Sequence, residues 1–373
     1  MPAADPVAET SGGPVRGVRS AGVSVFQGVP YAEAPVGELR FAPPRERRAW
    51  DGMLDATRPA PAAPQPPSRL VRVVGPMRFA QSEDCLTVNV WTPGTGGDLP
   101  VLVWLHGGAY TAGAGGQDWY AAERLAARGM VVVSVTYRLG ALGFLYLGEP
   151  DGGHGAGNFG LLDQLAALRW VRANAAAFGG DPDSVTVAGQ SAGALSILAL
   201  AAGPHAGVLG PRLIMQSLPG GIAPAAPADA ARVAGLYLAE LGLGPGDAAR
   251  LRELPVADLL AAQRRVMPRA ARLMDLAPPS GPARSAPTCS ATRGARRTSG
   301  RPRRNRAAGP PACWAASPTR RTSARPRRGW RTPPGPPTCT GSTGTRARSS
   351  GRATAWSCRS CSAPRTPGGR PRG

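Results

Sequence analysis

Alternating and continuous apolar stretches predict a series of strands in the first 280 residues. Residues 17–31 alternate between apolar and polar side chains and predict an N-terminal β-hairpin, and residues 85–91 alternate again as a single strand. Residues 101–105 and 130–135 form almost continuous apolar runs, which are typical of parallel strands covered on both faces. Residues 211–216 are expected to add one more strand.

Between these predicted strands lie segments whose apolar residues have helical spacing. A short helix is predicted within residues 118–128, and a longer one spans residues 161–178 and ends before two glycines. Residues 57–68 are rich in proline and alanine and predict a loop, whereas the leucine-rich stretch 229–275 has the amphipathic character of lid helices. Strands that alternate with helices predict an α/β fold with a mostly parallel central sheet flanked by helices.

The most specific chemical signal follows a short predicted strand at residues 185–188. The next five residues, 189–193, read Gly-Gln-Ser-Ala-Gly, and residues 194–202 have helical composition. This order is typical of a nucleophile elbow, a sharp turn that leaves no room for a Cβ two positions before or after the serine. The Ser191 hydroxyl would stand at a helix N-terminus, where backbone N–H groups can meet an oxyanion. A turn of small residues without chemistry is the alternative, and five residues alone do not decide between them.

Charge divides the chain into two unequal parts. Of the 44 basic residues, all of them arginine, 21 lie in residues 281–373, which contain no acidic residue. The other 23 arginines are balanced by all 23 acidic residues within residues 1–280, so the charge of that part indicates neither a nucleic-acid nor a membrane partner. Residues 1–280 are therefore interpreted as one domain and residues 281–373 as a separate tail.

The tail is expected to be disordered, because it has no Leu, Ile, Val, Phe, Met or Tyr to bury. Apart from Asn305, its residues are Ala, Pro, Thr, Ser, Arg, Gly, Cys or Trp, all of which have codons with G or C at the second base. This alphabet favours an out-of-frame translation that begins near residues 274–282. A natural arginine-rich arm is the alternative.

The cysteines and the N-terminal residues indicate how the protein packs and in which compartment it is expected. Cys85 is the only cysteine before residue 281, so it is expected to pack as a small buried apolar residue. The other five receive no role, and the lone Cys358-x-x-Cys361 pair is a weak signal. The first ten residues contain no apolar run, which predicts a cytoplasmic protein without a signal peptide or membrane span.

Ordered motifs between residues 17 and 217 resemble the type B carboxylesterase family of α/β-hydrolases. They are residues 26–32 (FQGVPYA), 40–41 (RF), 50–52 (WDG), 82–86 (SEDCL), 89–91 (NVW), 106–108 (HGG), 137–140 (YRLG), 142–144 (LGF), 157–164 (GNFGLLDQ), 178–182 (FGGDP) and 189–193 (GQSAG). Gln190 stands where the family most often has glutamate. The resemblance implies an α/β-hydrolase fold, and with it a serine esterase.

The resemblance also implies roles for individual residues. Ser191 is the expected nucleophile for a small-molecule carboxylic ester, and the backbone N–H groups of Gly107, Gly108 and Ala192 are the expected oxyanion donors. No cofactor or metal is expected. His106 is expected to orient the oxyanion loop rather than act as the base. Glu83 and Arg138 are expected to form a structural ion pair, and Asp163 a contact on a helix face.

The sequence departs from the family at the catalytic base. In this fold the triad follows in the order serine, acid, histidine. The three histidines are His106, His154 and His205, and only His205 follows Ser191, at the expected far end of the elbow helix. The triad acid and histidine are therefore expected to be lost with the reading frame, together with the last strands of the sheet, which predicts impaired hydrolysis.

The sequence is also compatible with two other functions. The first is an esterase-like body that binds partners without catalysis. The second is a nucleic-acid-binding tail whose arginines neutralise phosphates, although three tryptophans offer few stacking platforms. The sequence does not indicate an oligomeric state.

Overall fold

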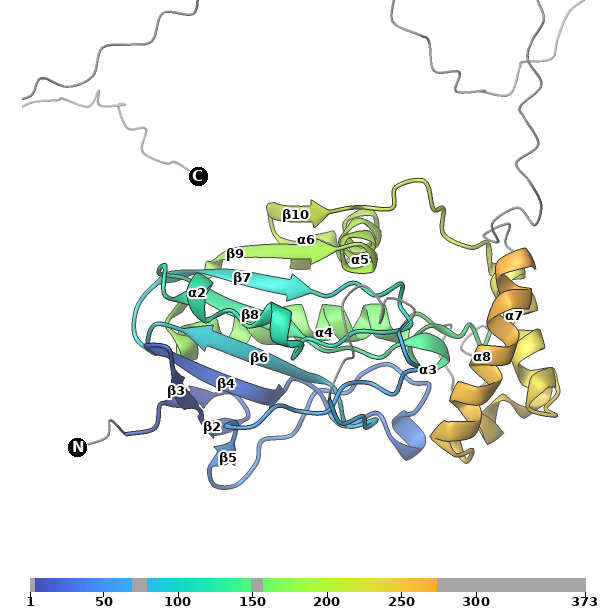
Figure 1. The fold of residues 1–373 in the computed structure, drawn as a ribbon, viewed down its shortest axis with the longest axis horizontal. Helices are drawn as coiled ribbons and strands as arrows, with labels where there is room; N and C mark the ends of the chain where they lie inside the picture. Colours follow the sequence, from blue (N-terminus) through green and yellow to red (C-terminus); the bar gives the residue numbers. More distant parts are fainter. Residues whose placement is uncertain (1–3, 69–78, 149–156, 274–373) are drawn as a thin grey trace, which may run out of the picture. The chain divides into compact units, whose positions relative to one another are not determined.

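The structure, a computed structural model, describes residues 4–68, 79–148 and 157–273. Figure 1 shows a central sheet with helices around it. Within the described residues the sheet has seven strands: β3 (Val18–Ser20), β4 (Val23–Pro30), β6 (Thr87–Thr92), β7 (Leu99–Leu105), β8 (Val131–Val135), β9 (Gly180–Gln190) and β10 (Arg212–Gln216). Their order across the sheet is β10-β9-β7-β8-β6-β4-β3.

The sheet is mixed, with a parallel half and an antiparallel half. Strands β10, β9, β7 and β8 are joined by parallel pairs, and β8, β6, β4 and β3 by antiparallel pairs. Antiparallel neighbours can be joined by tight turns, as in the predicted β3–β4 hairpin, whereas parallel neighbours need crossover connections. The α/β architecture predicted from the sequence is confirmed, but the described sheet is mixed instead of mostly parallel, because the N-terminal strands pair antiparallel to β8 and to one another. The parallel half carries the apolar runs that predicted it.

A second, small sheet near the N-terminus was not predicted. It consists of β1 (Val7–Thr10), β2 (Gly13–Arg16) and β5 (Leu54–Asp55). These strands have only two to four residues and contain proline, glycine and charged side chains, so their pattern is too short to indicate a strand.

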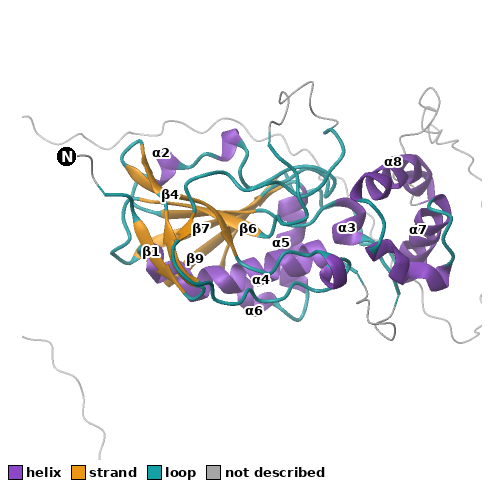
Figure 2. Cartoon of the chain, turned by 90° about the horizontal axis from the view of Figure 1, so that it is seen from below, coloured by secondary structure: helices purple, strands orange, loops and turns teal. Residues whose placement is uncertain are grey.

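Helices cover both faces of the main sheet. Figure 2 shows α2 (Glu123–Ala126) on one side and α4 (Phe159–Asn174), α5 (Ala192–Ala202) and α6 (Ala206–Leu209) on the other. Alternate residues of β8 serve the two sides: Val131 and Val133 belong to the large core with Leu168 of α4, and Val132 packs with Ala126 of α2. Both faces of this strand are thus buried, which explains its continuous apolar run.

A helical layer lies beyond the carboxyl ends of β7 and β9 (Figure 1). It contains α3 (Gly140–Phe144), α7 (Pro227–Glu240) and α8 (Val256–Leu273), and Tyr237 and Leu259 pack there against Leu142. The stretch 229–275 was predicted to form amphipathic helices, and its described residues do so in α7 and α8. Short 3-10 turns complete the described elements: η1 (Gly37–Leu39), η2 (Asp118–Tyr120), η4 (Ala175–Phe178) and η5 (Pro245–Arg252).

The predicted ion pair between Glu83 and Arg138 is wrong, because each residue has another partner. The guanidinium of Arg40 donates to both carboxylate oxygens of Glu83, at 2.7 and 2.5 Å. Arg138 follows β8 and meets Asp163 of α4, where Nε and Nη2 donate to the two carboxylate oxygens at 2.8 and 2.6 Å. Asp163 thus anchors a helix to the end of a strand.

Several further predictions can be placed. Cys85 is a fully buried free cysteine, as predicted. Within the described chain β10 pairs only with β9, and its Ile214 and Met215 side chains are exposed, as expected of a sheet edge. No described helix has the length and apolar character needed to cross a membrane. The tail at residues 281–373, with its five cysteines, and His154 lie outside the described residues.

Candidate active site

Ser191 occupies a strained turn between β9 and α5. Its backbone has φ 54° and ψ −114°, and it is the residue immediately before the first turn of α5. Its N–H donates to the carbonyl oxygen of Gln216 at 2.9 Å, and its own carbonyl accepts from Leu195 N–H at 2.9 Å. A non-glycine residue at positive φ is costly and is kept only where its surroundings hold it. β10 and α5 thus hold the serine in place.

The two glycines around Ser191 are required by close backbone contacts. A Cβ at Gly189 would lie 2.6 Å from the carbonyl carbon of Gly193. A Cβ at Gly193 would overlap the carbonyl oxygen of Leu105 at the end of β7, and would lie 2.9 Å from that of His106. The predicted steric reason for both glycines is confirmed, because Gly189 packs against the first turn of α5 and Gly193 packs against the end of β7 and the residue that follows it.

This loop brings Gly107 and Gly108 beside the serine. A Cβ at Gly107 would lie 2.5 Å from Gln190 Oε1 and 3.3 Å from the Cβ of Ser191. Gly108 has φ 123°, and its carbonyl oxygen accepts from the N–H groups of Thr111 and Ala112 at 3.0 and 3.1 Å. Ala192 is the first residue of α5, so its N–H has no acceptor within the helix. The three residues predicted as oxyanion donors therefore gather around Ser191.

His106 is built into the core beneath this loop. It is fully buried, and its ring stacks on Tyr137 with centroids 4.3 Å apart and an interplanar angle of 13°. Its Nδ1 lies 2.8 Å from the carbonyl oxygen of Gly107, and Nε2 has no hydrogen-bond partner among the described residues. Burial lowers the pKa of His106 to about 4, so the ring is neutral at pH 7. Neither ring nitrogen bonds Ser191, which agrees with the predicted orienting role.

His205 lies at the far end of the elbow helix. It directly precedes α6 and follows the eleven-residue α5, whose length is about 16 Å at 1.5 Å per residue. Ser191 stands at the opposite end of α5. His205 is therefore out of reach of the hydroxyl, as the sequence predicted.

A cavity of about 460 Å³ opens in front of Ser191. Its wall includes Gly108 and Ala112 from the loop after β7 and, from α8, Arg264 and Met267. The sequence did not predict the two α8 residues. The sequence predicted α8 only as part of an amphipathic stretch of lid helices, and amphipathic spacing does not show which turn of the helix faces the serine.

Comparison with known proteins agrees with this geometry. The model of the Carboxylesterase family matches residues 4–280. The chain is 44% identical over 258 residues to the para-nitrobenzyl esterase of Bacillus subtilis (strain 168), which covers 69% of this chain and 52% of the relative. It is 47% identical over 271 residues to a probable N-octanoylanthranilate hydrolase of Rhodococcus erythropolis, covering 71% and 57%. The chain thus spans about half the length of the curated relatives it matches.

Solved structures give the same result. A thermophilic para-nitrobenzyl esterase aligns with a TM-score of 0.67 at 43% identity, covering 71% of this chain and 55% of that one. A carboxylesterase of Geobacillus stearothermophilus aligns with a TM-score of 0.65 at 42% identity, covering 72% and 56%. These matches confirm the predicted α/β-hydrolase fold. Taken with a family match over most of the chain, they show that this protein belongs to the carboxylesterase family.

Proposed function

We propose that this protein is a serine carboxylester hydrolase in which Ser191 is the nucleophile and the backbone N–H groups of Gly107, Gly108 and Ala192 stabilise the oxyanion. The observation that carries the proposal is the strained backbone of Ser191 at the start of α5, packed against Gly107. Strain of this kind is kept where a side chain must point in one direction. Family membership supports the same chemistry.

The reaction would proceed by acyl transfer. In the first step the Ser191 hydroxyl oxygen attacks the ester carbonyl and the carbonyl oxygen becomes negative; the C–O bond to the alcohol then breaks, and the alcohol leaves with the proton from Ser191. In the second step a water molecule attacks the acyl-Ser191 ester, which releases the carboxylic acid and returns a proton to Ser191. Losing one oxyanion donor typically costs roughly 10²-fold to 10³-fold in rate. Glycine at 107 and 108 lets a substrate approach the main chain closely, because no Cβ stands between them.

The substrate class is a small carboxylic ester. The relatives include proteins named para-nitrobenzyl esterase and cocaine esterase. The mostly apolar wall of the Ser191 cavity suits an uncharged acyl or alcohol group, and Arg264 is its one charged lining residue among those described. We therefore expect neutral esters to be accepted, with Arg264 favouring a carboxylate at the cavity mouth.

Both steps of the reaction are slow in this proposal, and deacylation is the slower of the two, because the acyl-Ser191 ester is less activated than an aryl ester. Neither described histidine bonds the hydroxyl, so we expect slow hydrolysis of activated aryl esters only. Binding and an oxyanion hole without a working triad still give roughly 10³-fold to 10⁴-fold over water.

Hydrolysis of p-nitrophenyl acetate by the purified 373-residue chain tests the proposal. We expect a slow rate that Ser191→Ala removes. The matched control is Ser217→Ala, because Ser217 also has positive φ and follows the adjacent strand β10, yet it is exposed. Equal rates for the wild type and Ser191→Ala would contradict the proposed nucleophile, and a non-catalytic binding role would then be favoured.

A further inference from the structure

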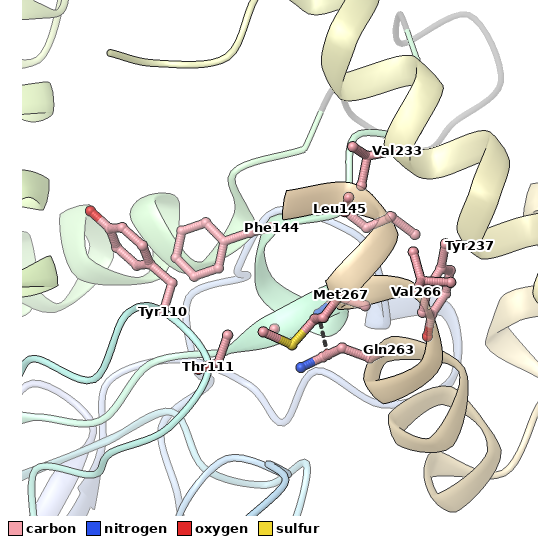
Figure 3. Close-up of a pocket in the computed structure, with 12 residues that line it drawn as sticks. Tyr110, Thr111, Phe144, Leu145, Val233, Tyr237, Gln263, Val266 and Met267 are labelled. Atoms are coloured by element: carbon pink, nitrogen blue, oxygen red, sulfur yellow. Dashed lines mark hydrogen bonds between the residues drawn. The ribbon is translucent and has the colours of Figure 1, made fainter. Parts of the chain in front are cut away.

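A second cavity of about 200 Å³ lies next to the Ser191 cavity. Figure 3 shows Tyr110, Phe144 and Tyr237 around it, and its other walls come from α3, α7 and α8. Thr111 and Met267 line both cavities, so a molecule bound at Ser191 borders on this space. The chemistry of acyl transfer described above does not use it.

One polar side chain in this apolar cavity has an unused hydrogen-bond donor. Gln263 of α8 is only 6% exposed, and its Oε1 accepts from the Ala141 N–H at 2.8 Å. Its Nε2 is buried and has no partner among the described residues. A backbone N–H can only donate, so the contact with Ala141 fixes the amide oxygen and leaves Nε2 as the donor.

The backbone around Gln263 is shaped to hold its amide group. Gly140 has φ 56°, and a Cβ there would lie 2.7 Å from Nε2 and closer still to Oε1. The N–H of Gly140 donates to the Tyr110 carbonyl at 2.7 Å. Glycine at 140 therefore makes the space that the amide fills, and the loop after β7 fixes its position.

We propose that this cavity is a specificity subsite for the part of an ester substrate that carries a hydrogen-bond acceptor, such as a ketone, ether or amide oxygen, on an apolar group. The inference rests on the proposed function, because the cavity borders on Ser191. A buried donor without a partner is unfavourable, and an acceptor oxygen would satisfy it without bringing a charge into apolar surroundings. The volume suits a ring-sized group, since a dry cavity of about 150 Å³ admits benzene.

Movement of the Met267 side chain would admit a ligand to the Gln263 amide. Nε2 of Gln263 has no contact with solvent, so a ligand reaches it only when a neighbouring side chain moves. Met267 borders both cavities, and Figure 3 shows its thioether at the same end of the cavity as the Gln263 amide. An unbranched methionine changes rotamer readily and fills irregular gaps.

Binding of two matched ligands to the full chain tests the subsite without relying on turnover. Acetophenone and α-methylstyrene have the same shape, but only acetophenone carries an acceptor oxygen. Their dissociation constants are compared by NMR titration for wild type and Gln263→Glu, at pH values up to about 9 so that the glutamate is ionised; the carboxylate keeps an acceptor for Ala141 and has no donor. We expect the ratio of the two constants to shift against acetophenone by about tenfold. Gln263→Met offers a second variant without the donor should the glutamate prevent folding.

The matched control is Gln164→Glu. Gln164 of α4 is also fully buried with its amide unpaired among the described residues, but it does not line this cavity. Its ligand ratio should equal that of the wild type. An unchanged ratio in both Gln263 variants overturns the subsite, whether or not esters are hydrolysed.

Kinetics separate this inference from the proposed function. For p-nitrophenyl 5-oxohexanoate against p-nitrophenyl hexanoate, the ratio of kcat/KM should fall by about tenfold in Gln263→Glu. A ratio that stays constant while Ser191-dependent hydrolysis is present overturns the subsite alone. A ligand ratio that shifts without any Ser191-dependent hydrolysis supports the cavity assignment and counts against the esterase.

Discussion

Replacing Asp163 by asparagine removes one charge from the most deeply buried ion pair in the described chain. The side chains of Arg138 and Asp163 are 4% and 0% exposed, and two guanidinium nitrogens donate to the carboxylate at 2.8 and 2.6 Å. The Arg138 N–H also donates to Asp163 at 3.1 Å. The variant would leave a buried guanidinium without its counter-charge.

The expected loss of stability is large. Breaking a buried ion pair by removing one partner costs about 3 to 5 kcal/mol, against a typical total stability of about 5 to 15 kcal/mol. With a urea m-value of about 2 kcal/mol/M, the unfolding midpoint should fall by roughly 1.5 to 2.5 M. Circular dichroism during urea titration measures this shift.

Asp229→Asn is the control, because Asp229 pairs with Arg232 three residues along α7 with both side chains well exposed. Exposed pairs contribute about 0 to 1 kcal/mol, so its midpoint should barely move. Arg138→Met combined with Asp163→Leu should recover much of the loss, since apolar replacements of both partners remove the unpaired charge. A shift for Asp163→Asn no larger than that of Asp229→Asn would refute this account of the anchor between β8 and α4.

Three further variants test the site. Gly193→Ala should lower the Ser191-dependent ester rate by about 10²-fold, because its Cβ displaces the elbow from β7 by about 1 Å, whereas Gly235→Ala on α7, with open space around it, should leave the rate unchanged. Burial lowers the His106 pKa to about 4 from its ordinary 6.5, so the neutral ring contributes its full stability above pH 6.5. That contribution, roughly 3 kcal/mol, is lost as the pH falls toward 4. His106→Asn should therefore flatten the plot of unfolding free energy against pH between these values, as measured by urea unfolding. Arg264→Glu should lower kcat/KM for an ester of a dicarboxylic acid relative to p-nitrophenyl butyrate by up to about fivefold, and 1 M salt should reduce the difference. If neither the substitution nor the salt changes this ratio of kcat/KM values, Arg264 does not contribute to substrate binding.

The parallel half of the sheet could be predicted because its residues are buried on both faces. Val131–Val135 is apolar almost throughout, so no polar face had to be assigned, and the glycines at 189 and 193 marked the turn that follows β9. The small sheet of β1, β2 and β5 could not be predicted. Its strands are held by contacts distant in sequence, such as Trp50 Nε1 donating to the Pro14 carbonyl at 3.2 Å.

The ion pairs and the second cavity depend on distances that the sequence does not contain. Arg40 reaches Glu83 because the residues after η1 pack beside η5, where Arg40 also donates to the carbonyl oxygen of Arg252 at 2.9 Å. Gln263 appears in the sequence as an ordinary polar residue of an amphipathic helix. Its amide group fits in the cavity because Gly140 has no side chain, and only the folded structure shows that Gln263 and Gly140 lie next to each other.

The acyl-enzyme itself gives the most direct test of the central claim that Ser191 is the nucleophile. The full chain is mixed with excess p-nitrophenyl acetate for increasing times, quenched in acid, and examined by intact-mass and peptide mass spectrometry. We expect one acetyl group per chain to accumulate on the peptide that contains Ser191, because neither described histidine serves as a base for the second step. Ser191→Ala should stay unmodified, and Ser217→Ala should be modified like the wild type. Acetylation that is spread over several serines, or that persists in Ser191→Ala, would contradict the claim.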